Sequence, residues 1–253
     1  MTGSDGKTTI PTLKVKDGLE RPLPKRFYSA VSVAAHEAAF AVLLDGRPLR
    51  TPKKRALAVP SAALAESVAA EWSAQGERID PATMPMTRLV NSALDTVADH
   101  ATEVRAAIVM YAGSDLLCYR AEAPEGLVEA QLEVWNGALD WARSALGVDF
   151  MVTTGLMPVA QPAAATAAVA RAIAGLEPLR LAALHVMTTL TGSALLALAC
   201  HMGARDAASV WSAAHIDEDW QISRWGDDAE AASRRALRRT EFEAASRLLT
   251  LLG

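Results

Sequence analysis

The sequence is poor in cysteine. Its two cysteines, Cys118 and Cys200, stand far apart and inside apolar segments. There is no CxxC pair and no Cys/His spacing typical of a zinc site, so neither a disulfide framework nor a structural zinc ion is predicted. This usage is typical of two buried thiols in a reducing compartment.

The chain also lacks an excess of positive charge and an apolar leader. Its formal net charge is −4, which gives no reason to expect nucleic acid as a partner. The segment from Met1 to Gly18 is polar and has no apolar region of the kind that a signal peptide requires. We therefore expect a cytoplasmic protein whose residues 1–24 form a flexible tail.

One uncharged stretch is long enough to cross a bilayer. Between Arg180 and Arg205 lie 24 residues without a formal charge. His185 and His201, together with several threonines, dilute its hydrophobicity. We expect one central helix of a helical domain from Pro178 to Met202 and no integral membrane span. A membrane-associated scaffold that uses residues 181–202 remains an alternative.

Charge and periodicity divide the chain near residue 60. Residues 1–60 carry 11 Lys and Arg against 5 Asp and Glu, whereas residues 61–253 carry 14 against 24. Before the division the pattern alternates, and Asp45-Gly46 supplies a hairpin turn. After it, Leu64, Val68 and Trp72 follow at helical spacing.

These patterns predict an α+β fold with two domains. A small antiparallel β domain covers residues 25–60, with a boundary as late as residue 85, and a helical domain covers residues 61–253. Phe27 to Val33 reads as a further short strand. Later elements are expected at 148–152 (strand) and at 163–174, 178–202 and 205–224 (helices), with a last helix after residue 228.

No motif with catalytic or ligand-binding chemistry is present. The five histidines form no HExxH pattern, and there is no nucleophile elbow, kinase motif or dinucleotide fingerprint. We predict no catalytic residue, no cofactor and no metal. The acidic cluster at 217–230 reads as a solvated helix face, and an uncharacterised soluble enzyme that uses these acids is the alternative.

Short stretches in a fixed order carry the strongest signal. They are Arg26-Phe27-Tyr28, Val42 to Pro52, Glu71-Trp72, Ile79 to Leu89, Asp115 to Arg120, Trp135, Trp141-Ala142, Asp217 to Gln221 and Trp225 to Asp228. In order and spacing they resemble a family of assembly chaperones of mitochondria and α-proteobacteria. Members of that family bind the α subunit of the F(1) sector of ATP synthase.

The resemblance implies a β-rich N-terminal domain, a helical C-terminal domain and no catalysis. It implies the free F(1) α subunit as the partner, a bacterial cytoplasmic location with a family counterpart in the mitochondrial matrix, and a monomer when free. A free α subunit exposes the surface that should meet β, and a large exposed apolar surface aggregates. A chaperone that covers this surface reversibly keeps the subunit in solution until β displaces it.

The C-terminal signature supplies the candidate partner-binding residues. We expect these side chains around one helix–helix junction, with Trp225 as the anchor and the acids setting orientation: Asp217, Glu218, Gln221, Trp225, Asp228 and Glu230. Four residues are expected to be structural: Trp72, Asp45, Gly46 and Gly226. The alternative for Trp225 and Gly226 is a tight helix corner, and the alternative interface is the basic β domain around Arg47 to Arg55.

Overall fold

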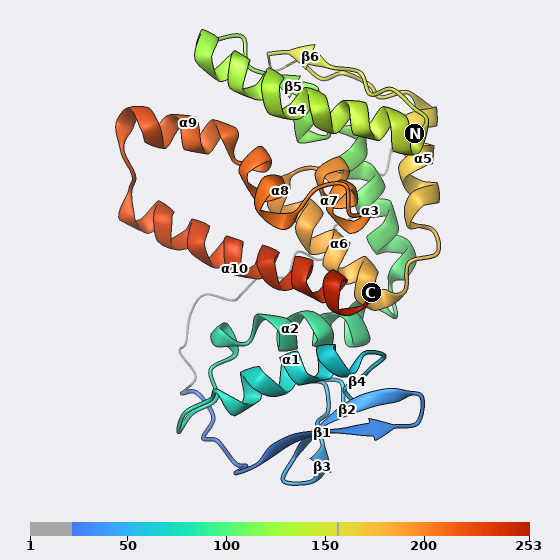
Figure 1. Ribbon diagram of the computed structural model, residues 1–253, viewed down its shortest axis with the longest axis vertical. Helices are drawn as coiled ribbons and strands as arrows, with labels where there is room; N and C mark the ends of the chain where they lie inside the picture. The colour runs from blue at the N-terminus through green and yellow to red at the C-terminus, as the bar shows by residue number, and fades with distance from the viewer. Residues whose placement is uncertain (1–21, 156) are drawn as a thin grey trace, which may run out of the picture.

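The computed structural model describes residues 22–155 and 157–253. A small sheet lies at one end of the molecule and a larger set of helices fills the rest (Figure 1). This confirms the predicted α+β fold class. Most of the expected tail, residues 1–21, lies outside the described residues, and the expected domain boundaries stay a prediction. The strands are β1 (Val31–His36), β2 (Ala39–Leu44), β3 (Arg47–Pro48) and β4 (Ala58–Val59).

The turn between β2 and β3 forms at the predicted residues. Asp45 and Gly46 have φ values of 47° and 76°, as a tight hairpin turn with two left-handed residues requires. The Asp45 carboxylate also accepts hydrogen bonds from the backbone N–H groups of Ser29 and Ala30, at 3.0 and 2.8 Å. These bonds lower the pKa of Asp45. Asp45 therefore fixes both the turn and the chain that leads into β1.

Strand β1 begins later than the alternating run had suggested. The expected run was Phe27 to Val33, but the strand is Val31–His36 and pairs antiparallel with β2. The chain before it is not extended into the sheet, because Ser29 and Ala30 turn toward Asp45 instead. A second hairpin turn, at Glu37 with φ of 53°, joins β1 to β2. No glycine marks that turn in the sequence.

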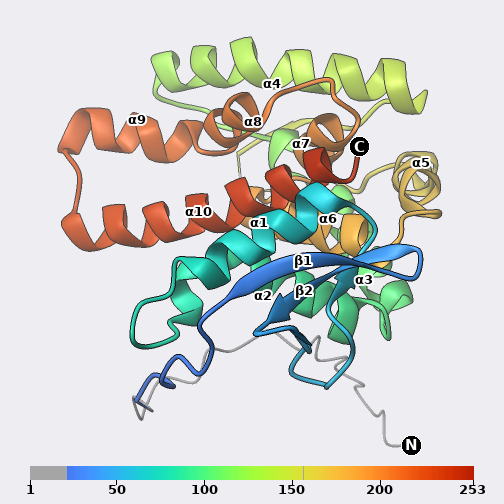
Figure 2. The ribbon, with the colours of Figure 1, turned by 60° about the horizontal axis from the view of Figure 1, so that its bottom comes forward.

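Helix α1 (Ala62–Ser73) covers one face of the sheet (Figure 2). Ser61 caps it by accepting from the N–H of Leu64 at 3.4 Å. Leu64 and Val68 are fully buried, as their spacing predicts. Trp72, the next residue of the stripe, is only half-buried, because it lies at the end of the helix against Tyr28.

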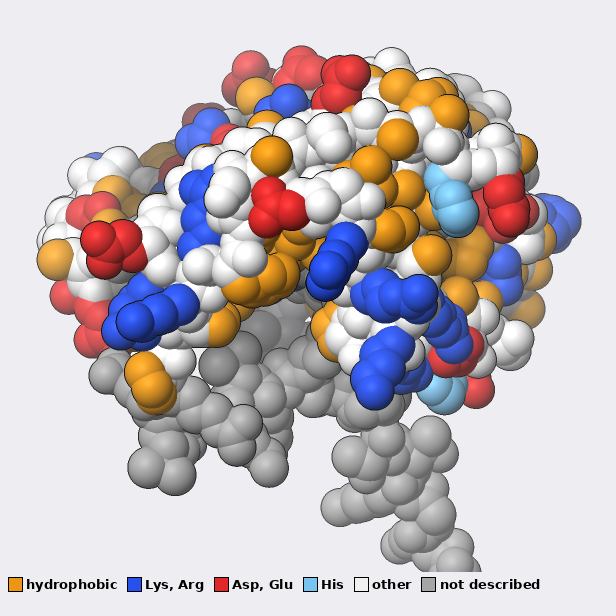
Figure 3. All heavy atoms as spheres, turned by 90° about the horizontal axis from the view of Figure 1, so that it is seen from below, with side chains coloured by type: hydrophobic (Ala, Val, Ile, Leu, Met, Phe, Trp, Pro, Cys, Tyr) orange, Lys and Arg blue, Asp and Glu red, His pale blue; other side chains and the backbone are white. Residues whose placement is uncertain are grey.

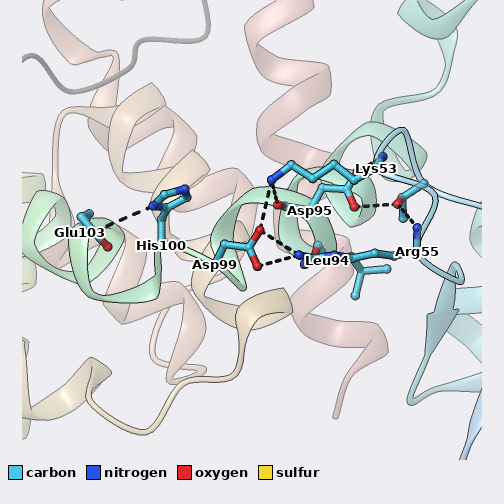
Figure 4. A network of polar contacts seen from close by, with 8 residues as sticks. Lys53, Arg55, Leu94, Asp95, Asp99, His100 and Glu103 are labelled. Atoms are coloured by element: carbon cyan, nitrogen blue, oxygen red, sulfur yellow. Dashed lines mark hydrogen bonds and ion pairs between the residues drawn. The ribbon is translucent and has the colours of Figure 1, made fainter.

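A polar network ties the sheet to the helices. After 3₁₀ helix η1 (Pro81–Thr83) and helix α2 (Pro85–Ser92), the chain forms a π-helical turn, η2 (Ala93–Val97). The buried Asp95 of this turn accepts from the Thr51 hydroxyl at 2.6 Å and from the Lys53 N–H at 2.8 Å (Figure 4). Arg55 and Lys53 also bind Asp99, which lowers the pKa of Asp99. Two cations of the basic turn at residues 53–55, Lys53 and Arg55, are thus engaged within the protein.

The remaining helices form the body of the molecule. They are α3 (Ala101–Gly113), 3₁₀ helix η3 (Leu116–Cys118), α4 (Glu125–Leu146), α5 (Ala163–Ile173), α6 (Pro178–Thr191), α7 (Ala194–His201), α8 (Ala207–Ala214), α9 (Ile216–Trp225) and α10 (Ala229–Leu251). Two short strands, β5 (Tyr119–Arg120) and β6 (Thr153–Thr154), pair in parallel. The strand expected at Val148 to Val152 is therefore wrong in position. Its apolar residues precede the residues that pair.

The central helix is interrupted, which corrects the prediction of one helix from Pro178 to Met202. Gly192 takes a left-handed φ of 70° and ends α6, and Ser193 then caps α7. Most side chains of α6 and α7 are buried, as expected for a central element. Among the described helices, none has the length and apolar character needed to cross a membrane.

We expect both cysteines to be slow to react in the folded protein. Burial raises the pKa of Cys118 to about 12, and burial also raises the pKa of Cys200. Cys200 is only half-buried, in contrast to the inaccessible residue that the sequence suggested, and its sulfur lies 3.8 Å from the Ser246 hydroxyl.

Thiol labelling at pH 7 tests this prediction. The native protein should react much more slowly than the same protein in denaturant, because little thiolate forms at this pH. A Cys118→Ser variant isolates the Cys200 signal. Rapid stoichiometric labelling of that variant in the native state would place Cys200 at an open surface.

Candidate partner-binding surface

Helix α9 and the first half of α10 form a helical hairpin that projects from the body (Figure 1). None of the ten residues of α9 is fully buried. Gly226, with φ of 84°, ends α9, and the Asp228 carboxylate caps α10 by accepting from the Ala231 N–H at 2.9 Å. Asp228 and Gly226 thus have a local structural role in the corner between the two helices. We call residues 216–240 the α9–α10 arm.

Asp217 attaches the base of the arm to α4, and Glu218 links the two helices of the arm. Asp217 accepts from the Gln131 side-chain amide of α4 at 2.7 Å. Gln131 is buried and its side-chain Oε1 accepts from the Ala121 N–H at 2.8 Å, so both the oxygen and the nitrogen of this amide have a partner. Glu218 lies 3.6 Å from the Arg235 guanidinium of α10, and Asp219 binds the same guanidinium. These acids therefore have partners within the protein as well as carrying charge.

The outer part of the arm is open to solvent. Gln221 and Glu230 are exposed, and Glu230 pairs with Arg234 one turn further along α10. Two apolar side chains are open to solvent here: Trp225 is 79% exposed and Leu237 is 65% exposed. The value for Trp225 is among the largest for apolar residues of the described chain. An exposed tryptophan beside charged groups is typical of an anchor in a protein–protein contact.

The structure does not gather the six candidate residues at one point. Asp217 and Trp225 stand at opposite ends of α9, about 12 Å apart at the helical rise per residue. The two ends of the set are therefore the base of the arm and its tip. The candidate residues run from the base of the arm along α9 and around the corner into the first turn of α10, so they do not surround a single junction.

The sequence did not reveal a groove between α4, α8 and α9. It has a volume of about 550 Å³ and is lined by Ala130, Val134, Arg205, Ser209, Ser212, Ala213, Ile216, Asp219, Trp220 and Ser223. We call it the α4–α8–α9 groove. It exists because the helix expected over 205–224 is two helices, which meet at His215. The one sequence feature that could have indicated this groove is the presence of small residues on one side of α4, at Gly126, Ala130 and Gly137.

Two contacts hold the helices that form this groove. A Cβ atom at Gly126 would lie 2.5 Å from the Trp220 ring, so only glycine lets α9 approach α4 so closely. His215 stacks on Trp211 with ring centroids 3.8 Å apart, and its Nδ1 lies 2.7 Å from the Trp211 carbonyl oxygen. Burial, more than the nearby arginines, lowers the pKa of His215. The imidazole is therefore neutral at pH 7 and packs as an aromatic ring.

A second charged surface lies on the β domain. Seen from below, Lys and Arg side chains gather over the part of the molecule that carries the sheet (Figure 3). Arg47, Arg50 and Lys54 are exposed there, whereas Lys53 and Arg55 are paired with Asp99. This surface is the alternative interface.

The acids of the arm do not converge as a catalytic pair requires. Asp217, Glu218 and Glu230 engage Gln131, Arg235 and Arg234, respectively. Across residues 22–155 and 157–253, no group of three His, Cys, Asp or Glu side chains is placed to hold a metal ion. An exposed tryptophan and a groove on a projecting helix pair define instead a surface typical of proteins that bind other proteins.

Comparison with known proteins agrees with a protein that binds other proteins. The family model for the ATP12 chaperone protein matches residues 25–143. The structure of a candidate chaperone from Agrobacterium tumefaciens is 47% identical, covers 92% of this chain and 88% of its own, and superimposes with a TM-score of 0.88. Atp12 from Paracoccus denitrificans is 42% identical, with 91% of this chain and 99% of that chain covered and a TM-score of 0.85. This chain belongs to the ATP12 chaperone family.

Proposed function

We propose that the protein binds the free α subunit of the F(1) sector of ATP synthase and prevents its aggregation until it pairs with β. Membership of the ATP12 chaperone family supports a chaperone role. The observation that carries the partner-binding side of the proposal is the exposed α9–α10 arm, with Trp225 at its tip. The protein acts in the bacterial cytoplasm as a monomer when free, without a cofactor, and its counterpart acts in the mitochondrial matrix.

The contact surface that we propose is the outer side of the arm. Asp217, Glu218 and Gln221 contribute at its base, and Trp225 and Glu230 contribute at its tip. Trp225 supplies the apolar contact area, while exposed acids steer association and set orientation. Reversible coverage of an apolar client surface needs no ATP, because the proper neighbour displaces the chaperone by mass action.

Neither alternative function has an observation in its favour. The enzyme alternative needs acids that converge, and those of the arm are engaged with separate partners. The membrane scaffold needs residues 181–202 at the surface, and most of these side chains are buried in the body.

Removing the acids should weaken α binding without changing stability. Glu218→Ala and Glu230→Ala remove carboxylates from partly or fully exposed ion pairs, which contribute little to folding. We expect melting temperatures close to that of the wild type and a slower association with purified α subunit, most visible at low salt. Surface plasmon resonance at two ionic strengths measures this.

Glu66→Ala is the matched control, because Glu66 is exposed on α1 and lies outside the proposed contact surface. Equal association rates for the wild type, both arm variants and the control would move the contact elsewhere. The basic β domain around Arg47 to Arg55 would then be the next surface to change.

A further inference from the structure

The α4–α8–α9 groove has an apolar interior that is fixed before any partner arrives. Ala130, Val134, Ala213 and Ile216 line it together with one ring, that of Trp220. The close approach of this ring to Gly126 holds α9 against α4. A groove with fixed walls binds without a large ordering cost. Its volume of about 550 Å³ leaves room for an apolar side chain and part of the backbone that carries it.

Helix geometry places two unpaired acids along the outer rim of the groove. On α4, Ala130 and Val134 face the groove, and Gln131 and Trp135, one position later, face the core. The residues that precede Ala130 and Val134 by one position are rotated about 100° around the helix in the other direction, toward solvent. These residues are Glu129 and Glu133, and both are exposed.

The charge of this rim is not neutralised within the part of the chain that the structure describes. Neither Glu129 nor Glu133 forms an ion pair there. On the opposite wall, Asp219 is bound to Arg235. Arg205 lines the groove and donates to the Val134 carbonyl oxygen at 3.3 Å, and Arg224 lies over the Trp220 ring at 4.8 Å. The carboxylates of Glu129, Glu133, Glu218 and Asp219 outnumber the guanidinium groups of Arg205, Arg224 and Arg235 around the groove. The net charge there is therefore negative, and the two of these carboxylates without an ion pair among the described residues are those of α4.

We infer that the groove receives a segment of the client that carries an apolar side chain next to a lysine or arginine. The apolar side chain enters between Val134 and Trp220, and the cation meets Glu129 and Glu133 at the rim. The inference rests on the proposed function for the identity of the client and adds a second contact, separate from the outer side of the arm. In such contacts the apolar anchor in its pocket supplies most of the affinity, and the charges at the rim set the orientation of the partner.

Filling the groove tests the apolar half of this inference. Ser212→Phe places a ring in the groove from an exposed position of α8 whose hydroxyl makes no hydrogen bond among the described residues. We expect its affinity for purified α subunit to fall about tenfold or more, the scale of a lost anchor. Ser144→Phe, at an exposed position near the end of α4, is the matched control and should bind as the wild type does.

Charge reversal tests the rim. The double variant E129K/E133K should lose affinity by a similar factor, and the loss should shrink at high salt. The control E66K/E103K makes the same change in net charge on α1 and α3 and should bind normally. Overlapping peptides of the α subunit, titrated while tryptophan fluorescence is followed, should bind only where an apolar residue adjoins Lys or Arg, and Ser212→Phe should abolish the signal.

The possible failures are distinct. If the wild type does not retain the α subunit at all, the proposed function is wrong. If the wild type retains it and S212F and E129K/E133K bind equally well, the groove inference is wrong and the proposed function stands. Circular dichroism and melting curves for each variant establish that a loss of affinity does not reflect unfolding.

Discussion

Replacing Asp115 with alanine should lower the free energy of unfolding by about 3 kcal/mol, the cost of leaving several buried donors unpaired. Asp115 is fully buried and follows α3. Its carboxylate accepts from the Ser193 hydroxyl at 2.7 Å and from the N–H groups of Leu195 and Leu117 at 3.0 and 3.1 Å. It therefore holds the chain after α3 to the break between α6 and α7, in the centre of the body.

The pH dependence of stability isolates this carboxylate. Burial raises the pKa of Asp115 to about 6, despite opposing hydrogen bonds from Ser193, Leu195 and Leu117. The folded pKa is above the unfolded value, so the stabilisation due to protonation is complete below about pH 4 and is lost as the pH rises through 6. The loss is on the order of 3 kcal/mol.

Asp115→Asn, which cannot titrate, supplies the comparison. Urea unfolding of the wild type and this variant between pH 4 and 7 measures the effect. The free energy of unfolding of the wild type should fall relative to that of Asp115→Asn over this range. All other carboxylates are common to both proteins and cancel in the difference. Parallel curves for the two proteins would show that Asp115 does not titrate here and would contradict the assigned environment.

Trp72→Arg should destabilise the protein by about 3 kcal/mol, because a half-buried aromatic contact is lost and a charge without a partner is introduced. The Trp72 ring packs against Tyr28 with ring centroids 5.6 Å apart. Arg26 already lies over the Tyr28 ring at 4.6 Å and donates to the Gln75 carbonyl oxygen. A second guanidinium at position 72 would lose the aromatic packing and lie beside a like charge.

The melting temperature measures this change. For a chain of this length, the expected loss corresponds to a fall on the order of 10 °C. Trp72→Phe is the control, because it keeps an aromatic ring against Tyr28 and removes an indole N–H that is buried without a partner in the described structure. We expect it to melt close to the wild type. A Trp72→Arg variant that also melts close to the wild type would mean that the contact with Tyr28 contributes nothing to folding.

The features that the sequence predicted correctly are local ones. Asp45-Gly46 identifies a turn because only a few residue types adopt two successive left-handed conformations. Leu64 and Val68 identify a buried helix face because their spacing matches one side of a helix. In both cases the physical cause lies within a few residues, so the pattern alone is sufficient.

The features that it missed depend on residues far apart in the chain. The break at Gly192 is stabilised by Asp115, which lies 77 positions earlier. The groove depends on the approach of Trp220 to Gly126, across 94 positions. Asp217 was predicted as a contact residue, and its hydrogen bond to Gln131 could not be seen from the sequence. Convergence of distant side chains leaves no periodic signal.

The most direct test of the proposed function is the fate of the isolated α subunit. The α subunit from the same organism is diluted from denaturant with and without this protein, and light scattering and size-exclusion chromatography follow the mixture. We predict low scattering, a complex that contains both chains, and release of the α subunit when the β subunit is added. Equal aggregation with this protein and with an inert protein of similar size, and no common peak in chromatography, would contradict the account.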